Sequence, residues 1–265
     1  DYLIRRMVDA TVRIKAGKFN INLPPTRTHE LNALSVSLTD MATELELKER
    51  YHSVLQMVAD PQVADELIHG GLRLGGEMRE VSILFCDVRG YTSMSVGMDP
   101  AEVISLLNEH MSALTRIVHA RKGVVKQFTG DGIMILFGAP KSYGCDALDA
   151  AHCAVEMMRE RLRLNDLAER PMRIGIGIAT GIVVAGGLGA ENRAEYTVVG
   201  ERVNLAARLC SAAAADEILI DEATMSTLPP EELNVEPIEA LSLKGYSRPI
   251  PAWRLHYHPP EPATT

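Results

Sequence analysis

Side chains suited to metal and phosphate chemistry occur in three separate stretches of the sequence: Asp87, Asp131, and the pair Asn204 and Arg208. Asp87 follows an apolar run, residues 81–85, that is typical of a buried strand. A carboxylate at the end of a buried strand costs free energy unless a metal or another cation compensates it. The pattern therefore indicates either a metal-binding acid or an acid that caps the next helix.

The backbone directly after Asp87 could hold an anion. The segment from Val88 to Thr92 is short and contains Gly90. The N–H groups of such a segment can curl around a phosphate. A metal-binding acid beside a phosphate site is the first hypothesis for this stretch.

Asp131 lies in the turn T-G-D-G between two expected strands, 124–128 and 133–137. Neighbouring antiparallel strands lie ~5 Å apart, so Asp87 and Asp131 converge if the strand of Asp87 lies beside this hairpin. Two adjacent carboxylates repel each other, and two divalent cations would remove that conflict and bind phosphates. The structural alternative for Asp131 is an ordinary Asp-Gly hairpin turn.

Asn204 and Arg208 are four residues apart on an expected helix, 200–213, so they share one face. The opposite face, with Val203, Ala206 and Cys210, can pack against the protein. An Asn and an Arg together could hold a ribose and a phosphoryl group. The alternative is a solvated helix face.

These residues must be positioned by a domain in which strands and helices alternate. Further helices are expected at 103–118, begun by Asp99-Pro100, and at 148–162. Further strands are expected at 173–180, 196–199, 218–220 and 250–255. The order predicts an α+β fold in which helices cover one face of an antiparallel sheet.

The N-terminal part reads as two helices, residues 2–15 and a second from about residue 28, joined across Pro24-Pro25. The second helix has apolar residues at alternating spacings of three and four, which favours a coiled-coil seam between two copies over a simple hairpin: Leu31, Leu34, Leu38, Met41 and Leu45. The apolar phase changes after Leu45, and a short helix is expected at 63–68.

Composition narrows the possible classes of protein. The 265 residues carry a net charge of −8 and are 46% hydrophobic, which argues for a large core and against a nucleic-acid partner. The four cysteines are scattered, as in a reducing compartment, and no apolar run is long enough to cross a membrane.

In combination, these motifs resemble a class III nucleotidyl cyclase over about residues 80–257. The resemblance implies a ferredoxin-like cyclase fold and conversion of ATP to 3′,5′-cyclic AMP and pyrophosphate by a homodimer. The matching stretches are residues 85–92 (F-C-D-V-R-G-Y-T), 128–132 (F-T-G-D-G), 137–140 (F-G-A-P), 173–177 (R-I-G-I-G) and 198–208.

The resemblance also implies a role for each matching residue. Asp87 and Asp131, helped by the Val88 carbonyl, would bind two Mg²⁺ or Mn²⁺ ions. Asn204 would orient the ribose and Arg208 would stabilise charge on the α-phosphate, both from the other protomer. The implied phosphate contacts are the backbone of Val88, Arg89, Gly90, Tyr91 and Thr92, together with Arg173 and Lys244.

Two base-reading positions depart from the pattern of adenylyl cyclases. Gln127 stands where their purine-reading Lys is found, and Thr197 stands where Asp is common. Lys126 is one residue too early to replace that Lys, because adjacent side chains on a strand face opposite ways. Glu and Cys, which guanylyl cyclases tend to have at these positions, are both absent.

The N-terminal segment resembles a HAMP signalling domain, on its first helix, the connector at Gly17-Lys18-Phe19, Pro24 or Pro25, and Glu30. The expected organisation is a HAMP-like domain at 1–46, a coiled-coil linker at 47–79, a cyclase domain at 80–257 and a disordered tail at 258–265. HAMP domains usually sit just inside a membrane. A transmembrane or sensor region upstream is therefore expected, and this chain is expected at the cytoplasmic face of the membrane.

Three alternatives remain at the level of the sequence. A guanylyl or dual-specificity cyclase would use the same residues. A diguanylate cyclase would leave Asn204 and Arg208 unexplained. A nucleotide-binding regulatory domain without activity is disfavoured, because the metal-binding and transition-state residues are all present.

Overall fold

The computed structural model describes residues 2–24, 28–70, 75–166, 168, 170–190 and 193–257. The chain divides into two compact units, Asp1–Ala64 and Asp65–Thr265. The tail predicted at 258–265 lies outside the described residues, as do 71–74 between the two predicted domains.

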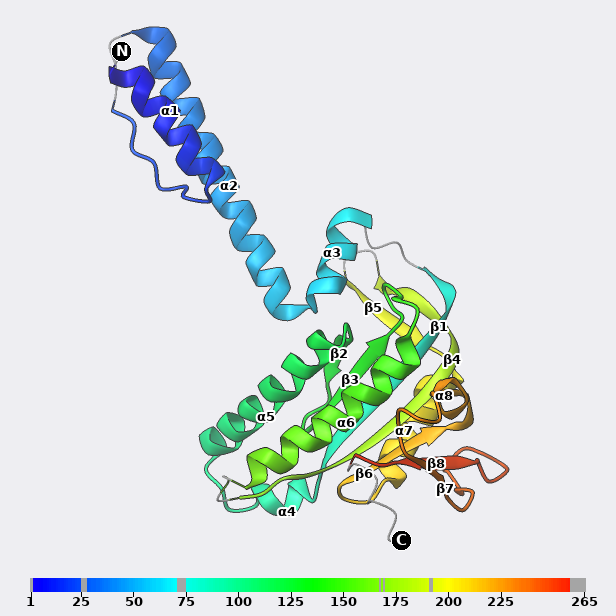
Figure 1. Ribbon diagram of the computed structural model, residues 1–265. Helices are drawn as coiled ribbons and strands as arrows, with labels where there is room; N and C mark the ends of the chain where they lie inside the picture. The colour runs from blue at the N-terminus through cyan, green and yellow to red at the C-terminus, as the bar shows by residue number, and fades with distance from the viewer. Residues whose placement is uncertain are drawn as a thin grey trace. The chain divides into compact units, whose positions relative to one another are not determined.

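The N-terminal unit is built from α1 (Tyr2–Lys15) and α2 (His29–Val58), which confirms both expected helices (Figure 1). Helix α3 (Pro61–Gly70) follows and spans the boundary between the units. Met7 and Ala10 of α1 are buried, as are Leu38 and Ala42 of α2. The two helices therefore pack by small and apolar side chains on their facing sides.

The predicted seam of α2 is only partly buried within one chain. Leu38 is 8% exposed, whereas Leu34 and Met41 are 48% and 49% exposed. Helix α1 covers one flank of the seam and leaves the other flank to solvent. The helix also continues through the phase change after Leu45, so the change of apolar pattern does not end it.

The second unit contains one eight-stranded sheet with the order β2-β3-β1-β4-β6-β8-β7, and β5 pairs with β4 (Figure 1). The strands are β1 (Gly75–Arg89), β2 (Val124–Phe128), β3 (Gly132–Phe137), β4 (Arg173–Ala190), β5 (Arg193–Val199), β6 (Glu217–Asp221), β7 (Val235–Pro237) and β8 (Ala252–Leu255). The helices are α4 (Tyr91–Ser95), α5 (Pro100–Ala120), α6 (Asp146–Asn165), α7 (Glu201–Ala212) and α8 (Glu222–Thr227).

The predicted α+β fold is confirmed, with three differences in detail. The helices do not cover only one face of the sheet, because α7 lies on the face opposite α5 and α6. β4 pairs with β6 in parallel, while the other strand pairs are antiparallel. β1 and β4 are longer than expected, because both extend past the buried part of the sheet as a ribbon of partly exposed residues. The extension takes β1 into the stretch predicted to be a linker.

The core lies between one face of the sheet and helices α5 and α6. Alternate residues of the central strands fill it, including Leu84 and Cys86 of β1 and Ile174, Ile176 and Ile178 of β4. The α5 helix begins as expected, with the Asp99 side chain accepting from Ala101 N at 2.8 Å and Pro100 at the first turn.

Helix α7 packs on the opposite face. A Cβ on Gly177 of β4 would overlap the backbone of Ala206 and Cys210, so the missing side chain lets the helix approach the strand closely. Leu205, Ala206, Leu209 and Cys210 are buried on the side of α7 that faces the sheet. This helix therefore lies on the same face of the sheet as Asp87.

Candidate active site

The two predicted metal-binding acids meet at one end of β1. Asp87 pairs in register with Gly132 of β3 and with Gly175 of β4. The turn that precedes β3 is closed by Thr129 N donating to Gly132 O at 2.8 Å, and Gly130 takes a φ of 79°. Asp131 is thereby placed directly beside the Asp87 carboxylate.

The surroundings of Asp87 disfavour its charged form. Burial raises the pKa of the Asp87 carboxyl, and the neighbouring Asp131 raises it further, while Arg89 lowers it. Gly132 allows this approach, since a Cβ there would lie 3.2 Å from Asp87 Oδ1 and closer still to other atoms. The two carboxylates repel each other, and a hard divalent cation bound between them would remove that repulsion.

The segment after Asp87 turns sharply. The Val88 side chain is 3% exposed and belongs to the core, so only its main chain can reach the site. Gly90 adopts φ 70° and ψ 18°, a left-handed conformation that favours glycine, and α4 begins at Tyr91. Thr92 lies exposed in the first turn of α4, while Tyr91 packs against the core.

Arg89 has side-chain contacts that the sequence analysis did not foresee. Its Nη1 donates to Asp87 Oδ2 at 3.1 Å, and its Nη2 donates to the main-chain carbonyl of Cys210 in α7. The spacing of two residues along a strand was the available signal, because it places Asp87 and Arg89 on one face.

Arg173 begins β4 and pairs in register with Arg89. Its Nε donates to Asp216 Oδ2 at 2.6 Å, and the side chain is 60% exposed. The predicted phosphate ligand thus has a carboxylate partner in the chain, which the sequence analysis did not identify. Asp216 takes a φ of 62°, so this acid comes from a left-handed turn before β6.

Asn204 and Arg208 share one side of α7, as their spacing predicted, and both are exposed there. Among the described residues, no hydrogen bond or ion pair joins either side chain to Asp87 or Asp131. Lys244 is exposed in a turn beside Leu243, which is buried, and Tyr246 of the same turn donates to Glu201 O at 3.5 Å. The turn that carries Lys244 therefore approaches the start of α7.

The base-reading positions are partly reorganised by a β-bulge. The β2–β3 register shifts between Val125 and Gln127, so Lys126 is an extra residue and the strict alternation of side chains fails there. The Lys126 side chain is 7% exposed, and its Nζ lies 3.6 Å from Glu195 Oε2 on β5. Gln127 pairs with Met134, which pairs with Phe85, and this places Gln127 on the Asp87 face.

Thr197 lies on β5, paired with Gly186 of β4. It lines a shallow, mainly apolar cavity of about 270 Å³ together with Val184, Leu188 and Val199. Glu195, two residues before Thr197, is the partner of Lys126. The ion pair between Lys126 and Glu195 thus joins β2, which carries Gln127, to β5, which carries Thr197.

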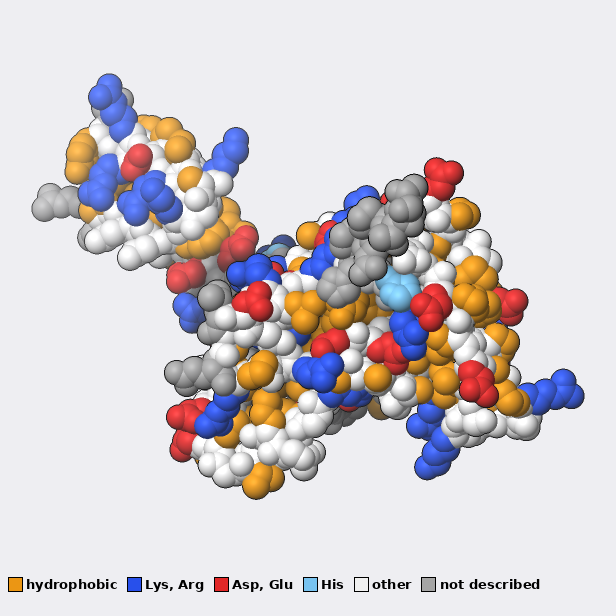
Figure 2. All heavy atoms as spheres, turned by 60° about the horizontal axis from the view of Figure 1, so that its bottom comes forward, with side chains coloured by type: hydrophobic (Ala, Val, Ile, Leu, Met, Phe, Trp, Pro, Cys, Tyr) orange, Lys and Arg blue, Asp and Glu red, His pale blue; other side chains and the backbone are white. Residues whose placement is uncertain are grey.

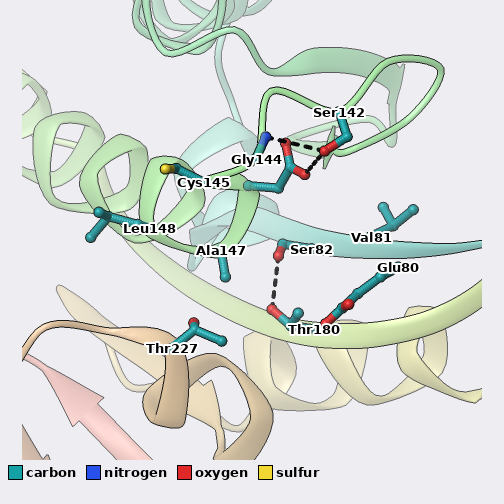
Figure 3. Close-up of a pocket in the computed structure, with 11 residues that line it drawn as sticks. Glu80, Val81, Ser82, Ser142, Gly144, Cys145, Ala147, Leu148, Thr180 and Thr227 are labelled. Atoms are coloured by element: carbon teal, nitrogen blue, oxygen red, sulfur yellow. Dashed lines mark hydrogen bonds between the residues drawn. The ribbon is translucent and has the colours of Figure 1, made fainter.

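A cavity of about 340 Å³ lies elsewhere in the unit and contains none of the predicted site residues. It opens near the start of α6, beside the middle of β1 (Figure 3), and its lining includes Glu80, Ser82, Cys145, Asp146, Thr180 and Thr227. Ser82 Oγ and Thr180 Oγ1 are 2.8 Å apart, and Thr180 Oγ1 is 2.8 Å from Thr224 Oγ1.

These hydroxyl groups connect to α7 through Asp221. Asp221, which is 2% exposed, accepts from Thr224 Oγ1 at 2.6 Å and from Arg202 Nη1 at 3.3 Å. Arg202 lies in the first turn of α7. The helix is therefore held near its start by Asp221 and near its end by Arg89.

Charged side chains of both signs occur on one face of the molecule. On the face seen in Figure 2, basic and acidic side chains are interspersed and apolar side chains lie between them. At the end of β1, Asp87 has both an acid, Asp131, and an arginine, Arg89, as neighbours.

Comparison with known proteins places this arrangement of residues in a family. Residues 76–256 match the family described as adenylate and guanylate cyclase catalytic domain. The chain belongs to this family. It is a class III nucleotide cyclase domain, and residues 4–47 match the HAMP domain family.

Solved structures of cyclases are similar to it. The adenylyl cyclase CyaB from P. aeruginosa is 30% identical, with 69% of this chain and 96% of that chain covered and a TM-score of 0.66. The guanylyl cyclase Cya2 is 37% identical, with 69% and 94% covered and a TM-score of 0.61. Both an adenylyl and a guanylyl cyclase are therefore among the structures that this chain resembles.

Curated relatives are longer than this chain. The uncharacterized protein Rv1318c of Mycobacterium tuberculosis is 36% identical over 209 residues, which are 78% of this chain and 38% of the relative. The uncharacterized protein Rv1320c of the same organism is 32% identical over 250 residues, 93% of this chain and 43% of the relative. Within the part of the chain that the structure describes, no helix is long and apolar enough to cross a membrane.

Proposed function

We propose that this cyclase domain converts ATP to 3′,5′-cyclic AMP and pyrophosphate, in a site that two copies of the chain share. The observation that carries the proposal is the separation of two sets of residues. Asp87 and Asp131 converge at the end of β1, whereas Asn204 and Arg208 lie on the exposed side of α7, and among the described residues no hydrogen bond or ion pair joins them to the two acids. A second chain can bring the two sets together.

The residues at the end of β1 fit two divalent cations. Asp87 and Asp131 would hold them with the main-chain carbonyl of Val88, and this all-oxygen donor set suits Mg²⁺ or Mn²⁺. Burial and the neighbouring Asp131 raise the pKa of the Asp87 carboxyl despite Arg89, and a bound cation would favour its charged form. Such cations, when bound, supply activation of the attacking oxygen and neutralisation of phosphate charge.

The remaining residues orient the nucleotide. The backbone of Arg89, Gly90, Tyr91 and Thr92 would contact the terminal phosphates, and Asn204 would fix the ribose. The 3′-oxygen attacks the α-phosphorus, the bond to the β-phosphate oxygen breaks, and the hydroxyl proton leaves to solvent. Arg208 stabilises the charge that develops on the α-phosphate.

Two further cations of the chain can assist at the phosphates. Lys244 is exposed in its turn and free to reach toward a nucleotide. Arg173 reaches the phosphates only by sharing or exchanging its carboxylate partner Asp216, whose Oδ2 lies 2.6 Å from Arg173 Nε. We therefore assign Arg173 a weaker role than Lys244.

The base would be read by Gln127 and Thr197. Adenine and guanine differ in the donors and acceptors they present, and the Gln amide and the Thr hydroxyl can each donate and accept. A site that leaves no buried group unpaired with the wrong base rejects it weakly. We therefore propose a modest preference for ATP over GTP.

A guanylyl activity is the second candidate, since the guanylyl cyclase Cya2 is 37% identical to this chain. The ion pair between Lys126 and Glu195 lies on the same two strands as Gln127 and Thr197. It offers one donor and one acceptor, which either purine could use.

The N-terminal unit would regulate the cyclase as a dimer. Leu34 and Met41 of α2 remain half-exposed, so a second copy could cover them. We propose the organisation HAMP at 1–46, linker at 47–79 and cyclase at 80–257, downstream of a membrane-linked sensor and on the cytoplasmic side. The phase change after Leu45 would be the step at which the signal alters helix packing.

A product assay tests the proposed activity. The purified chain is incubated with Mn²⁺ and either ATP or GTP, and the products are identified by mass spectrometry. The proposal predicts 3′,5′-cyclic AMP and pyrophosphate from ATP, with a higher kcat/KM than for GTP. Cyclic GMP as the dominant product would establish the guanylyl alternative, and absence of both products would contradict a cyclase function.

A further inference from the structure

The side chain of Arg89 touches two parts of the site that the proposed chemistry uses separately. Its Nη1 lies 3.1 Å from Asp87 Oδ2. Its Nη2 donates to the carbonyl of Cys210 and lies 3.8 Å from Cys210 Sγ. One guanidinium therefore joins a proposed metal-binding carboxylate to the last turn of the helix that carries Asn204 and Arg208.

The fold leaves a space for this guanidinium. Gly175 lies directly across from Asp87 on β4, and a Cβ on Gly175 would overlap the Arg89 guanidinium. The Arg89 side chain is 20% exposed. Only glycine at position 175 leaves room for the Arg89 guanidinium to approach the strand this closely.

Within the part of the chain that the structure describes, the Arg89 guanidinium makes hydrogen bonds through both Nη atoms but not through Nε. Its Nε is buried and has no hydrogen-bond partner among the described residues. A buried unpaired donor costs free energy, so the two Nη contacts must hold the side chain where it is. A fork of rigid donors suits such a bridge, which a single ammonium group cannot reproduce.

We propose that Arg89 is a positioning residue that couples the metal-binding end of β1 to α7. The inference rests on the proposed function, in which Asp87 of one chain and Asn204 and Arg208 of the other complete each site. A dimer then has two sites, and each chain gives Asp87 to one site and α7 to the other. Arg89 consequently connects the two sites through one side chain.

Occupation of Asp87 by a cation changes the charge that Arg89 contacts. The guanidinium then keeps its bond to the Cys210 carbonyl while its attraction to Asp87 weakens. The end of α7 responds to the cation through this contact. Without Arg89, the cation affects β1 and the β2–β3 turn but not α7.

Hydrogen exchange with Mn²⁺ as the probe tests this without any turnover. The full chain is measured by mass spectrometry with and without Mn²⁺, in the parent, Arg89→Met and Arg89→Lys. The proposal predicts that Mn²⁺ changes exchange in peptides of the β2–β3 turn in all three proteins. It predicts a change in α7 peptides only in the parent.

Arg202→Met is the matched control, because Arg202 also links α7 to an aspartate, Asp221, at the other end of the helix. In the Arg202→Met variant, the amide hydrogens of α7 should exchange faster than in the parent, and their exchange should still respond to Mn²⁺. The Lys variant keeps the charge and the long side chain, so it remains informative if the Met variant folds poorly.

Steady-state kinetics give a second readout. Both Arg89 variants should lose about tenfold to a hundredfold in kcat, since a small misplacement of reacting groups is costly, while KM changes less than about threefold. An α7 response to Mn²⁺ that persists in both variants, or is absent in the parent, would overturn the coupling. A parent whose β2–β3 turn ignores Mn²⁺ would refute the proposed metal site, and this inference would fall with it.

Discussion

Adjacent residues of β1 face two different environments. Leu84, Cys86 and Val88 point into the core beneath α5 and α6, where they are at most 3% exposed. Asp87 and Arg89 point to the opposite face, where β4 contributes Gly175 and Gly177 and the helix α7 lies close. One face therefore stabilises the fold by apolar packing. On the other face, glycines leave space for α7 and for the charged side chains of the site.

The comparison implies that substitutions on the two faces fail in different ways. A change on the Asp87 face should remove activity and leave the fold intact. A change on the core face should reduce stability and leave the chemistry of the folded fraction intact. Each prediction below tests one side of this contrast.

The largest effect is expected from the acids at the end of β1. Asp87→Asn or Asp131→Asn should lower kcat at least about a thousandfold, because several kcal/mol of charge stabilisation are lost. Asp87→Asn should unfold at no lower denaturant concentration than the parent, since burial and Asp131 raise the pKa of this carboxyl and so disfavour its charge. Cyclase assays and urea unfolding check both. A variant that keeps more than a few per cent of parent activity contradicts the assignment.

The sequence analysis anticipated this face of the sheet in outline. The Asp-Gly turn is a local signal, and the analysis expected Asp87 to meet Asp131 if the two strands are neighbours. The pairing of β1 with β3 joins distant segments, so only the fold establishes it. The partners Asp216, Glu195 and Asp221 come from distant segments, and no local pattern pairs them with Arg173, Lys126 and Arg202.

Two other features also required the fold. The bulge at Lys126 breaks the period of two on which the prediction for β2 relied. The α7 helix packs on the second face of the sheet because Gly177 admits it, and a glycine in an apolar run does not by itself reveal which element approaches.

On the core face, Ile178→Ala should cost about 2–5 kcal/mol of unfolding free energy by leaving a cavity. Ile178 is 0% exposed and pairs with Leu84 and Ile220. Chemical denaturation measures the loss, and kcat at low temperature, normalised to folded protein, should stay within about twofold of the parent. A normal stability with a large fall in kcat would reverse the proposed division between faces.

Acid should destabilise the core side through His110. Burial, and then Arg161, lower the pKa of His110 to about 4, from about 6.5 when unfolded. The folded protein binds fewer protons between these values, so stability present above pH 6.5 is lost as the pH falls toward 4, by on the order of 3 kcal/mol. Arg161 Nη1 lies 3.3 Å from His110 Nδ1, so a protonated His110 would be repelled by the Arg161 guanidinium.

Unfolding of the parent and of His110→Gln, measured from pH 7.5 to pH 4.5, isolates this contribution. The variant should have a flatter pH dependence across that range. Parallel curves would show that His110 is not the group that titrates.

The smallest effect is expected at the base. Gln127→Lys should raise the ratio of kcat/KM for ATP over GTP about tenfold, since Lys can only donate and so favours the adenine N1 acceptor. The existing ion pair of Lys126 with Glu195 should persist. The ratio is measured with both nucleotides in both proteins. A parent that already excludes GTP strongly, or an unchanged ratio, would show that Gln127 does not read the base.

Complementation between two inactive variants tests the central claim most directly. Asp87→Asn and Arg208→Ala should each be inactive, because every site of either homodimer lacks one half. After subunit exchange, the equimolar mixture should recover roughly a quarter of parent activity, because half of the dimers are mixed and each of these has one intact site. A mixture that stays inactive although exchange is verified would contradict a site shared between two chains.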